Sequence, residues 1–242
     1  MKICATQTKP IKGDIEANIA SHKKLIDLAV SNGAGTIIFP ELSITGYEPE
    51  LAKTLATNLD DSRFDDFQQI SNAKHITIGI GMPAKSDAGI LISMLIFQPH
   101  KQRQIYSKQY LHEDEYPYFV NGGPQILLTE DGHTVAPAIC YELSVPEHSA
   151  NAFKSGATVY IASVAKSVAG VEKALKNLAD IARDYSMITL MSNCIGHCDN
   201  FDCGGKTSVW NNKGVLLGQL NDTNEGILMI DTETEEVIEK AI

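Results

Sequence analysis

Residues 36–41 read TIIFPE, and this stretch indicates the class of the fold. Residues 36–39 form a continuous, mostly apolar run, which is typical of a strand that is buried on both faces of a sheet. Pro40 ends the run, since proline cannot donate a hydrogen bond to a sheet, and Glu41 follows it directly. Strands of this kind occur in α/β folds, in which helices cover both faces of the sheet.

The segments on either side of this strand alternate between strand and helix patterns. Before it, residues 2–7 (KICATQ) are expected to form a short buried strand, and Asp14 is expected to cap a helix that ends near Gly33. A turn is expected at 130–132, and residues 193–205 are expected to be irregular. After residue 41 we expect helices over 62–73, 147–154 and 171–185, and strands over 75–81, 89–97, 103–108, 126–129, 134–139, 157–162, 187–191, 206–210, 214–219 and 226–231. The alternation predicts a layered α/β fold with mixed sheets, in a single domain over residues 1–242.

The composition is that of an ordinary globular protein, with 242 residues, 43% hydrophobic and 21% charged. The formal net charge of −10 argues against a general nucleic-acid binder and against a protein that binds membranes through basic residues. No stretch approaches the ~18 to 20 apolar residues of a membrane-spanning helix. The odd count of five cysteines suggests free thiols in a reducing compartment. We therefore expect a cytoplasmic protein without nucleic-acid or membrane partners.

Three reactive side chains follow apolar runs, where the carboxyl ends of strands are expected. They are Glu41, Lys108 and Cys140. Ligand-binding residues of α/β folds gather just beyond such strand ends. Cys140 is followed by Pro146, which suits the first turn of a helix, so the thiol is expected on a sharp strand-to-helix turn. Taken alone, each residue has an ordinary alternative: a loop carboxylate, a surface amine and a buried structural thiol. Their shared location favours a reaction centre.

Three motifs carry these residues in order. The first is FPELSITGY at 39–47, the second is YSKQYLHEDEYPYF at 106–119, and the third is ICYELSVPE at 139–147. With them, the chain resembles the nitrilase superfamily of carbon–nitrogen hydrolases, and the similarity runs from KICATQ to GGKTSVWNNKG. The resemblance implies a four-layer α-β-β-α sandwich with a Glu–Lys–Cys site. It also implies a homodimer or larger homo-oligomer.

The family pattern usually adds a second glutamate between the lysine and cysteine motifs. Glu113 and Glu115 compete for that position, and the family's spacing from Tyr118 favours Glu115. Asp114 lies between them and is a weaker alternative. Glu113 and Asp114 are otherwise expected to be loop acids in contact with water.

The resemblance and the chemistry of amides together suggest a role for each residue. Glu41 would take the proton of the Cys140 thiol, and Lys108 would favour the thiolate and the oxyanion of the intermediate. The backbone N–H of Tyr141 would be a second oxyanion donor, and Glu115 would orient Lys108. No metal or cofactor is needed for this chemistry. The side chains expected to contact the substrate are Tyr47, Tyr118, Tyr141 and Glu142.

A cluster of possible metal ligands lies late in the chain. Cys194, His197, Cys198 and Cys203 fall within ten residues, and such residue types can hold zinc. Their spacing matches none of the usual paired patterns, so we expect reduced thiols and no metal. A redox pair of Cys198 with Cys203 is an open alternative.

The resulting hypothesis is a hydrolase that cleaves a small amide into an acid and ammonia or an amine. Hydrolysis of N-carbamoyl compounds or of nitriles, and a non-catalytic interaction protein with the same fold, are the alternatives. Glu142 stands where the family often has aspartate, and SVPE replaces a more usual arginine-containing segment. That difference weakens a transfer of ω-amidase or N-carbamoyl specificity. From these 242 residues we expect no ATP-binding domain of the kind that a glutamine-dependent synthetase would carry.

Overall fold

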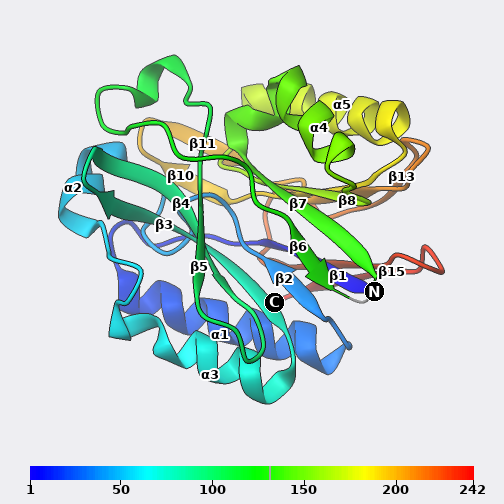
Figure 1. Cartoon of the computed structure of the whole chain (residues 1–242), viewed down its shortest axis with the longest axis horizontal. Helices are drawn as coiled ribbons and strands as arrows, with labels where there is room; N and C mark the ends of the chain where they lie inside the picture. Colours follow the sequence, from blue (N-terminus) through cyan, green and yellow to red (C-terminus); the bar gives the residue numbers. More distant parts are fainter. Residues whose placement is uncertain (131) are drawn as a thin grey trace.

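The computed structural model describes residues 1–130 and 132–242, which form four layers (Figure 1). Two sheets face each other in the middle. Helices α1 (Ile15–Ser31) and α3 (Asp65–Lys74) cover the outer face of one sheet. Helices α4 (Pro146–Lys154) and α5 (Val168–Tyr185) cover the outer face of the other. The four-layer α-β-β-α sandwich with two mixed sheets is therefore confirmed.

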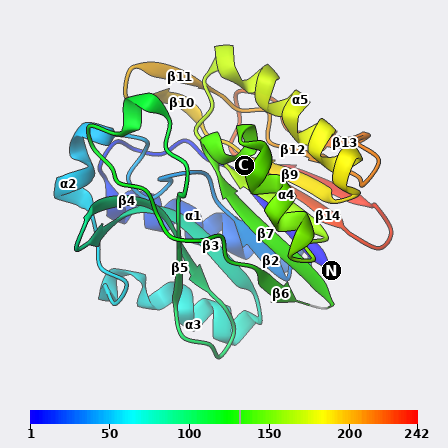
Figure 2. The same ribbon diagram turned by 45° about the horizontal axis from the view of Figure 1, so that its top comes forward.

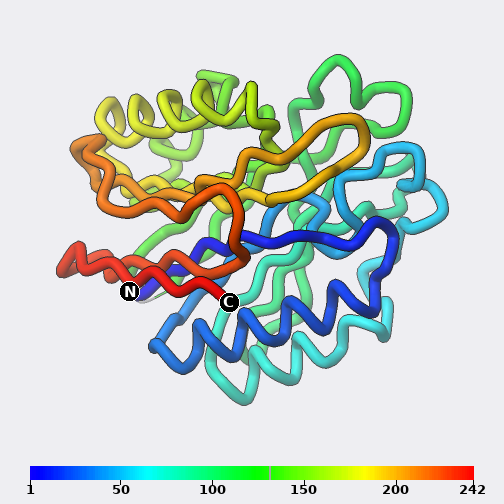
Figure 3. Tube along the Cα trace, turned by 180° about the vertical axis from the view of Figure 1, so that it is seen from behind, coloured from blue at the N-terminus to red at the C-terminus, as the bar shows by residue number. Residues whose placement is uncertain are grey.

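The first sheet has seven strands in the order β15-β14-β1-β2-β3-β4-β5. The parallel part is β1-β2-β3, and the remaining neighbours are antiparallel. The bounds are β1 (Lys2–Gln7), β2 (Thr36–Ile38), β3 (Thr77–Ser86), β4 (Gly89–Phe97), β5 (Gln104–Ser107), β14 (Gly226–Asp231) and β15 (Val237–Ala241). Figure 3 shows β14 and β15, in red, beside the blue first strand, so the two ends of the chain meet in this sheet.

The second sheet has six strands in the order β13-β12-β9-β8-β7-β6, of which β7, β8 and β9 run parallel. The bounds are β6 (Leu128–Glu130), β7 (His133–Ile139), β8 (Val159–Ser163), β9 (Ile188–Ser192), β12 (Ser208–Trp210) and β13 (Leu216–Gln219). A separate hairpin of β10 (Ile195–Cys198) and β11 (Phe201–Gly204) projects beyond this sheet (Figure 2). The short helices are η1 (Pro49–Leu51), α2 (Ala52–Leu55), η2 (Ser62–Phe64), η3 (Glu113–Glu115) and η4 (Cys140–Ser144).

The helices form for local reasons that the sequence contains. The Asp14 side chain accepts a hydrogen bond from the Ala17 N–H at 3.0 Å and so caps α1 as predicted. Pro146 opens α4, where its missing N–H costs nothing. On α5, the buried side chains lie at helical spacing on the face toward the sheet: Val171, Ala174, Leu178, Ile181 and Ala182. Among the described residues, no helix combines the length and the apolar character needed to cross a membrane.

Two hydrophobic cores hold the layers together. The larger lies between the two sheets and extends under α4 and α5, while the smaller lies between the first sheet and helices α1 and α3. Polar links also join the sheets where strands end. Ser163 Oγ donates to the carbonyl of Phe39 at 2.7 Å, and Ser192 Oγ donates to the carbonyl of Ile38 at 3.0 Å. These bonds fix the end of β2 against β8 and β9, next to Glu41.

Some expected elements differ from the observed ones. Residues 193–205 are not irregular, because they contain the β10–β11 hairpin, whose two-residue turn begins at Asp199 with φ 47°. Aspartate tolerates this left-handed conformation, and the two four-residue strands, IGHC and FDCG, show no clear apolar–polar alternation that would have predicted them. Strand β15 was also missed. The turn expected at 130–132 includes residue 131, which lies outside the described residues.

Candidate active site

Three of the expected residues follow strands whose ends lie at the same edge of the molecule. Glu41 comes after β2, Lys108 directly follows β5, and Cys140 directly follows β7. Cys140 is the first residue of η4 and has φ 45°, a left-handed conformation that costs energy for a residue with a side chain. The first N–H groups of a helix have no partner inside it. The turn therefore presents the thiol together with the N–H of Tyr141.

Lys108 lies at the centre of the charged groups. Its Nζ donates to Glu41 Oε1 at 2.8 Å and to Glu115 Oε1 at 2.6 Å, and all three side chains are almost completely buried. Tyr47 Oη donates to the same oxygen of Glu115 at 3.0 Å, and the His112 N–H donates to its other oxygen at 2.8 Å. Of the three acids in η3, Glu115 is the buried one that meets Lys108.

The turn that carries Glu41 packs against the backbone of β3. The Ile44 N–H donates to the Gly81 carbonyl at 3.0 Å, and the Gly81 N–H donates to Ser43 Oγ at 3.3 Å. A Cβ at Gly81 would lie 2.3 Å from the nitrogen of Leu42 and 2.4 Å from the carbonyl oxygen of Pro40. Such approaches are possible only without a side chain. Gly81 thus allows β3 to hold the Glu41 turn in place.

Burial and charge set the protonation of the site. Burial raises the pKa of Glu41, although Lys108 lowers it. Burial opposes the charge of Lys108, but the carboxylate of Glu41 and the negative form of Cys140 raise its pKa overall. Burial and the nearby Glu41 raise the pKa of the Cys140 thiol to about 11. The resting site therefore holds a neutral thiol, and the carboxyl group of Glu41 beside it is paired with Lys108.

One oxygen of Glu41 is free to accept a proton. Oε1 is bonded to Lys108, whereas Oε2 is buried and has no hydrogen-bond partner of normal geometry among the described residues. The neighbouring thiol of Cys140 nevertheless interacts with this carboxylate and lowers its pKa. An unused buried acceptor beside a thiol is the arrangement that a general base requires.

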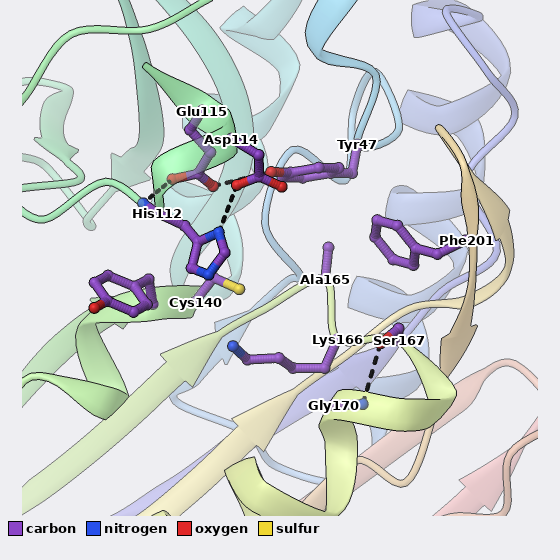
Figure 4. A pocket seen from close by; sticks show the side chains of 11 residues that line it. Tyr47, His112, Asp114, Glu115, Cys140, Ala165, Lys166, Ser167, Gly170 and Phe201 are labelled. Carbon is purple, nitrogen blue, oxygen red and sulfur yellow. Dashed lines mark hydrogen bonds and ion pairs between the residues drawn. The ribbon is translucent and has the colours of Figure 1, made fainter. Parts of the chain in front are cut away.

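A pocket of about 260 Å³ opens at the Cys140 side of this group. It is lined by Tyr47, His112, Asp114, Glu115, Cys140, Tyr141, Ala165, Lys166, Ser167, Gly170 and Phe201. Figure 4 shows the sulfur of Cys140 between Asp114 on one side and Lys166 on the other. The pocket thus combines a thiol with walls of opposite charge.

Lys166 was not expected from the sequence. It follows β8 after two intervening residues, and its side chain makes no hydrogen bond or ion pair with any described residue. Its positive charge lowers the pKa of Cys140, more than that of Lys108 does. Cys140 was selected because it directly follows a strand. Lys166 lies near the end of a strand too, but the strand was expected to end near residue 162, four residues before it. Phe201 belongs to the hairpin that was not predicted, and nothing in the sequence around it indicated a place in the pocket.

Two of the side chains expected to contact the substrate, Glu142 and Tyr118, lie outside the pocket. Glu142 is fully buried outside the pocket, where it accepts hydrogen bonds from Tyr106 Oη at 2.7 Å, the Ile139 N–H at 2.7 Å and the Gln109 N–H at 2.6 Å. Both of its carboxylate oxygens accept hydrogen bonds that hold the turn, and the residue does not line the pocket. Tyr118 is 41% exposed and does not line the pocket. Tyr47 and Tyr141 do line it.

The possible metal ligands separate into two groups. The sulfur atoms of Cys194, Cys198 and Cys203 lie within 4.8 Å of one another. His197 is instead exposed and pairs with Asp202 at 3.0 Å. A hairpin strand directs successive side chains to opposite faces, so His197 points away from the thiol of Cys198.

Comparison with known proteins gives a consistent picture. The family model described as carbon-nitrogen hydrolase matches residues 2–241. The chain is 25% identical over 239 residues to the glutamine-dependent NAD(+) synthetase of Aquifex aeolicus, which covers 95% of this chain and 42% of that protein. It is 23% identical over 247 residues to a Staphylococcus aureus protein named hydrolase in agr operon, covering 98% of this chain and 93% of that one. The chain thus spans less than half of the synthetase and nearly all of the hydrolase.

Solved structures share the fold. The NitN amidase from Nesterenkonia sp. AN1 superposes with a TM-score of 0.85 at 23% identity, over 96% of this chain and 92% of that one. In a variant of that amidase, the acetamide moiety of fluoroacetamide is added covalently at the active-site cysteine. The glutamine-dependent NAD+ synthetase from Acinetobacter baumannii also has a TM-score of 0.85, at 21% identity, and this chain covers 48% of it.

Proposed function

We propose that this chain, which belongs to the carbon–nitrogen hydrolase family, hydrolyses the C–N bond of a small amide through a thioester on Cys140. The observation that carries the proposal is the buried group of Glu41, Lys108 and Glu115 beside the thiol. Its Lys108 Nζ joins the two carboxylates at 2.8 and 2.6 Å. The free oxygen of Glu41 leaves one acceptor for the thiol proton.

The first half of the reaction forms the thioester. The sulfur of Cys140 attacks the amide carbon while Glu41 takes the thiol proton. Lys108 and the Tyr141 N–H stabilise the negative oxygen of the tetrahedral intermediate. When the intermediate collapses, the C–N bond breaks, and the proton passes from Glu41 to the leaving nitrogen. Ammonia or an amine departs, and the acyl group stays on sulfur.

The second half releases the acid. Glu41, now ionised again, takes a proton from a water molecule that attacks the thioester carbon. The C–S bond then breaks, and the proton returns to the sulfur of Cys140. Each proton gained by Glu41 is given back within the same half, so the site ends the cycle as it began. Lys108 and Glu115 keep their charges throughout and do not exchange protons with the substrate.

The pocket supports a small and polar acyl group. Its volume of about 260 Å³ suits a substrate of few heavy atoms. Lys166 offers a cation that has no hydrogen-bond or ion-pair partner among residues 1–130 and 132–242, and Asp114 offers a carboxylate on the opposite wall. A second candidate is therefore the side-chain amide of an amino acid such as glutamine, whose charged groups match these walls. The similarity to glutamine-dependent synthetases supports including it.

Ammonia release from a panel of compounds tests the proposal. The panel contains short aliphatic amides, glutamine, N-carbamoyl amino acids and nitriles. We expect turnover of at least one amide, lost in Cys140→Ala and nearly lost in Cys140→Ser, since a serine hydroxyl is far harder to deprotonate with a carboxylate. Cys4→Ala is the matched control, because Cys4 is a buried thiol in the other core.

Wild-type turnover by the folded Cys140→Ala variant would rule out the nucleophile. Brief treatment with iodoacetamide, followed by mass spectrometry, addresses the non-catalytic alternative. Cys140 is the one of the five thiols that lines the pocket, and a catalytic Cys140 should be alkylated faster than free cysteine. A Cys140 that reacts no faster than free cysteine, together with no turnover of any compound, would favour an interaction protein that keeps the fold.

A further inference from the structure

The β10–β11 hairpin carries three thiols that the proposed reaction does not use. Cys194 precedes β10, Cys198 ends it, and Cys203 lies in β11. Each residue is at most 4% exposed, and their sulfur atoms lie within 4.8 Å of one another. Cys194 Sγ donates to Cys203 Sγ at 2.8 Å. All three are free thiols in this structure.

The distances favour a bond between sulfurs over a shared metal ion. Two cysteine sulfurs bound to one zinc ion at ~2.3 Å in a tetrahedron lie ~3.8 Å apart. Cys194 and Cys203 are closer than that, at 2.8 Å. The residue that would complete a four-ligand set, His197, is exposed and turned to Asp202. A disulfide requires a sulfur separation of ~2.05 Å, so the two thiols need only a small movement.

We propose that Cys194 and Cys203 form a reversible disulfide when hydrogen peroxide or a similar peroxide reaches the protein, with Cys198 as the thiol that reacts first. The sulfur of Cys198 lies within 4.8 Å of the other two, and the neighbouring Cys194 and Cys203 lower the pKa of Cys198 to about 4. Such a group is a thiolate at neutral pH, and the thiolate is the form that peroxides oxidise. Cys198 therefore begins the sequence, and its two neighbours complete it.

The chemistry balances in three steps. The Cys198 thiolate attacks one peroxide oxygen, the O–O bond breaks, and a sulfenic acid forms as hydroxide leaves and takes a proton to become water. Cys194 then attacks the sulfenic sulfur, forming a Cys198–Cys194 disulfide and releasing the second water. Cys203 attacks the sulfur of Cys194, forming the Cys194–Cys203 disulfide and freeing Cys198 as a thiolate. Two thiols lose two electrons, and one peroxide gains them.

The hairpin also forms part of the pocket wall. Phe201 of β11 lines the pocket and lies 5.8 Å from the Tyr47 ring, between ring centres. The Gly204 N–H donates to the carbonyl of Lys166 at 2.8 Å, and Cys203 forms a β-bridge with Ser167. A bond between Cys203 and Cys194 would therefore shift residues that face the substrate. We expect oxidation to raise KM more than it lowers kcat. This consequence, unlike the disulfide itself, rests on the proposed function.

The test is peroxide treatment of the full chain, followed by alkylation of free thiols and mass spectrometry. We expect a loss of about 2 Da that dithiothreitol reverses. Protease cleavage before aspartate cuts at Asp199 and Asp202, which separates Cys203 from the other two thiols. The Cys203 peptide should then be joined to the peptide that holds Cys194 and Cys198, and fragmentation should assign the bond to Cys194.

Matched variants keep the outcome clear. Cys194→Ser and Cys203→Ser should each abolish the 194–203 bond, Cys198→Ser should slow its formation by about tenfold, and Cys4→Ser should leave it unchanged. If a variant fails to fold, the peptides of the oxidised wild-type protein still identify which two cysteines are bonded. Full alkylation of all five thiols after peroxide, a bond to another partner, or one zinc ion per chain bound to these thiols would overturn the proposal. The mass measurements detect the disulfide without any enzyme assay. A negative result would therefore reject the disulfide proposal and leave the amidase proposal untouched.

Discussion

At the scale of single residues, the site depends on one buried cation between two carboxylates. Lys108 is in contact with Glu41 and Glu115, and none of these side chains is more than 2% exposed. Two buried negative charges at this spacing would repel each other strongly without the lysine. Lys108 therefore has a structural task as well as the proposed catalytic one, and an experiment has to separate them.

Replacing Lys108 with alanine should lower kcat by a factor of about 10² to 10³, or ~2.7 to 4 kcal/mol, if the lysine stabilises the oxyanion. Folding should also weaken by ~3 to 5 kcal/mol, because the carboxylates lose their partner. Steady-state kinetics on the folded fraction, with urea unfolding in parallel, measure the two effects. Lys108→Arg should keep the charge without restoring turnover, since the planar guanidinium differs in shape and reach. A fall in kcat of less than about tenfold would make Lys108 peripheral.

At this scale, the sequence predicts which side chains lie together when position along a strand is enough. Glu41, Lys108 and Cys140 each follow an apolar run, and the family's spacing pointed to Glu115, which contacts Lys108. The sequence of a turn does not give the direction of a side chain, so it could not place Glu142 outside the pocket. Its carboxylate points back along the chain and accepts a hydrogen bond from the N–H of Ile139, three residues earlier.

At the scale of elements, the contact between β3 and the Glu41 turn should couple packing to activity. A Cβ at Gly81 would overlap the backbone around Glu41, where atoms lie within 2.3 to 2.9 Å of it. Gly81→Ala should therefore destabilise the fold by ~1 to 3 kcal/mol and displace Glu41 from the thiol. Activity should fall with stability, as measured by kcat and thermal unfolding. Gly123→Ala is the control, because a Cβ there meets no atom within 4 Å. Equal effects of the two changes would contradict the steric argument.

The turn after β7 should make stability depend on pH. Burial raises the pKa of Glu142 from 4.5 to about 7, although hydrogen bonds from Tyr106 and the Ile139 N–H oppose the shift. The folded protein therefore holds this proton more tightly than the unfolded chain. That stabilisation is present below the unfolded pKa and is lost as the pH rises through about 7, with a magnitude of about 3 kcal/mol.

Glutamine at position 142 cannot titrate, so it provides the comparison. Glu142→Gln should be less stable than the wild type, because one donor of the turn loses its acceptor. Its stability should also change less between about pH 5 and about pH 8. Urea unfolding across this range gives both values. Buried His148, whose Nε2 lies 3.4 Å from Glu142 Oε2, has a pKa lowered by burial and contributes in the opposite direction below its ordinary pKa of 6.5. Parallel curves would show that Glu142 does not titrate there.

Long, periodic elements were easier to predict than short ones. Strands β4 and β14 have the bounds expected from their apolar runs, and α5 was found from its helical spacing, with a start three residues earlier. The β10–β11 hairpin was missed because four-residue strands with glycine, histidine and cysteine have no clear alternation. It is held instead by contacts with distant residues, such as the bond from the Ile195 N–H to the Thr8 carbonyl at 2.9 Å.

At the scale of the whole molecule, the sheets bring together groups that lie far apart in the chain. Glu41 and Lys108 come from the first sheet and Cys140 from the second, and bonds such as Ser163 Oγ to the Phe39 carbonyl tie the two together. The candidate site is complete only when both sheets are folded and packed against each other. Sequence order alone could not give the distances in this centre, because they depend on how two sheets pack.

The family resemblance leads us to expect a homodimer or larger homo-oligomer. The apolar face of α5 is buried in the subunit's own core, so it is not available for a partner. On α4, Phe153 is 49% exposed and lies 5.4 Å from the ring of Tyr185, between ring centres. A symmetric pairing through α4 would bring the two copies of this aromatic pair together and remove them from water.

Replacing Phe153 with aspartate should therefore shift the oligomer to monomer, because a carboxylate at such an interface would be buried without a partner. Sedimentation velocity at micromolar concentration measures the species, and circular dichroism checks that the variant is folded. Asn151→Asp, at an exposed position on the same helix, is the control for added charge and should leave the assembly unchanged. A single wild-type species near 26.3 kDa would refute the oligomer. A folded Phe153→Asp oligomer of wild-type size would instead move the interface away from α4. Neither result would alter the assignment of Cys140, whose site is formed within one chain.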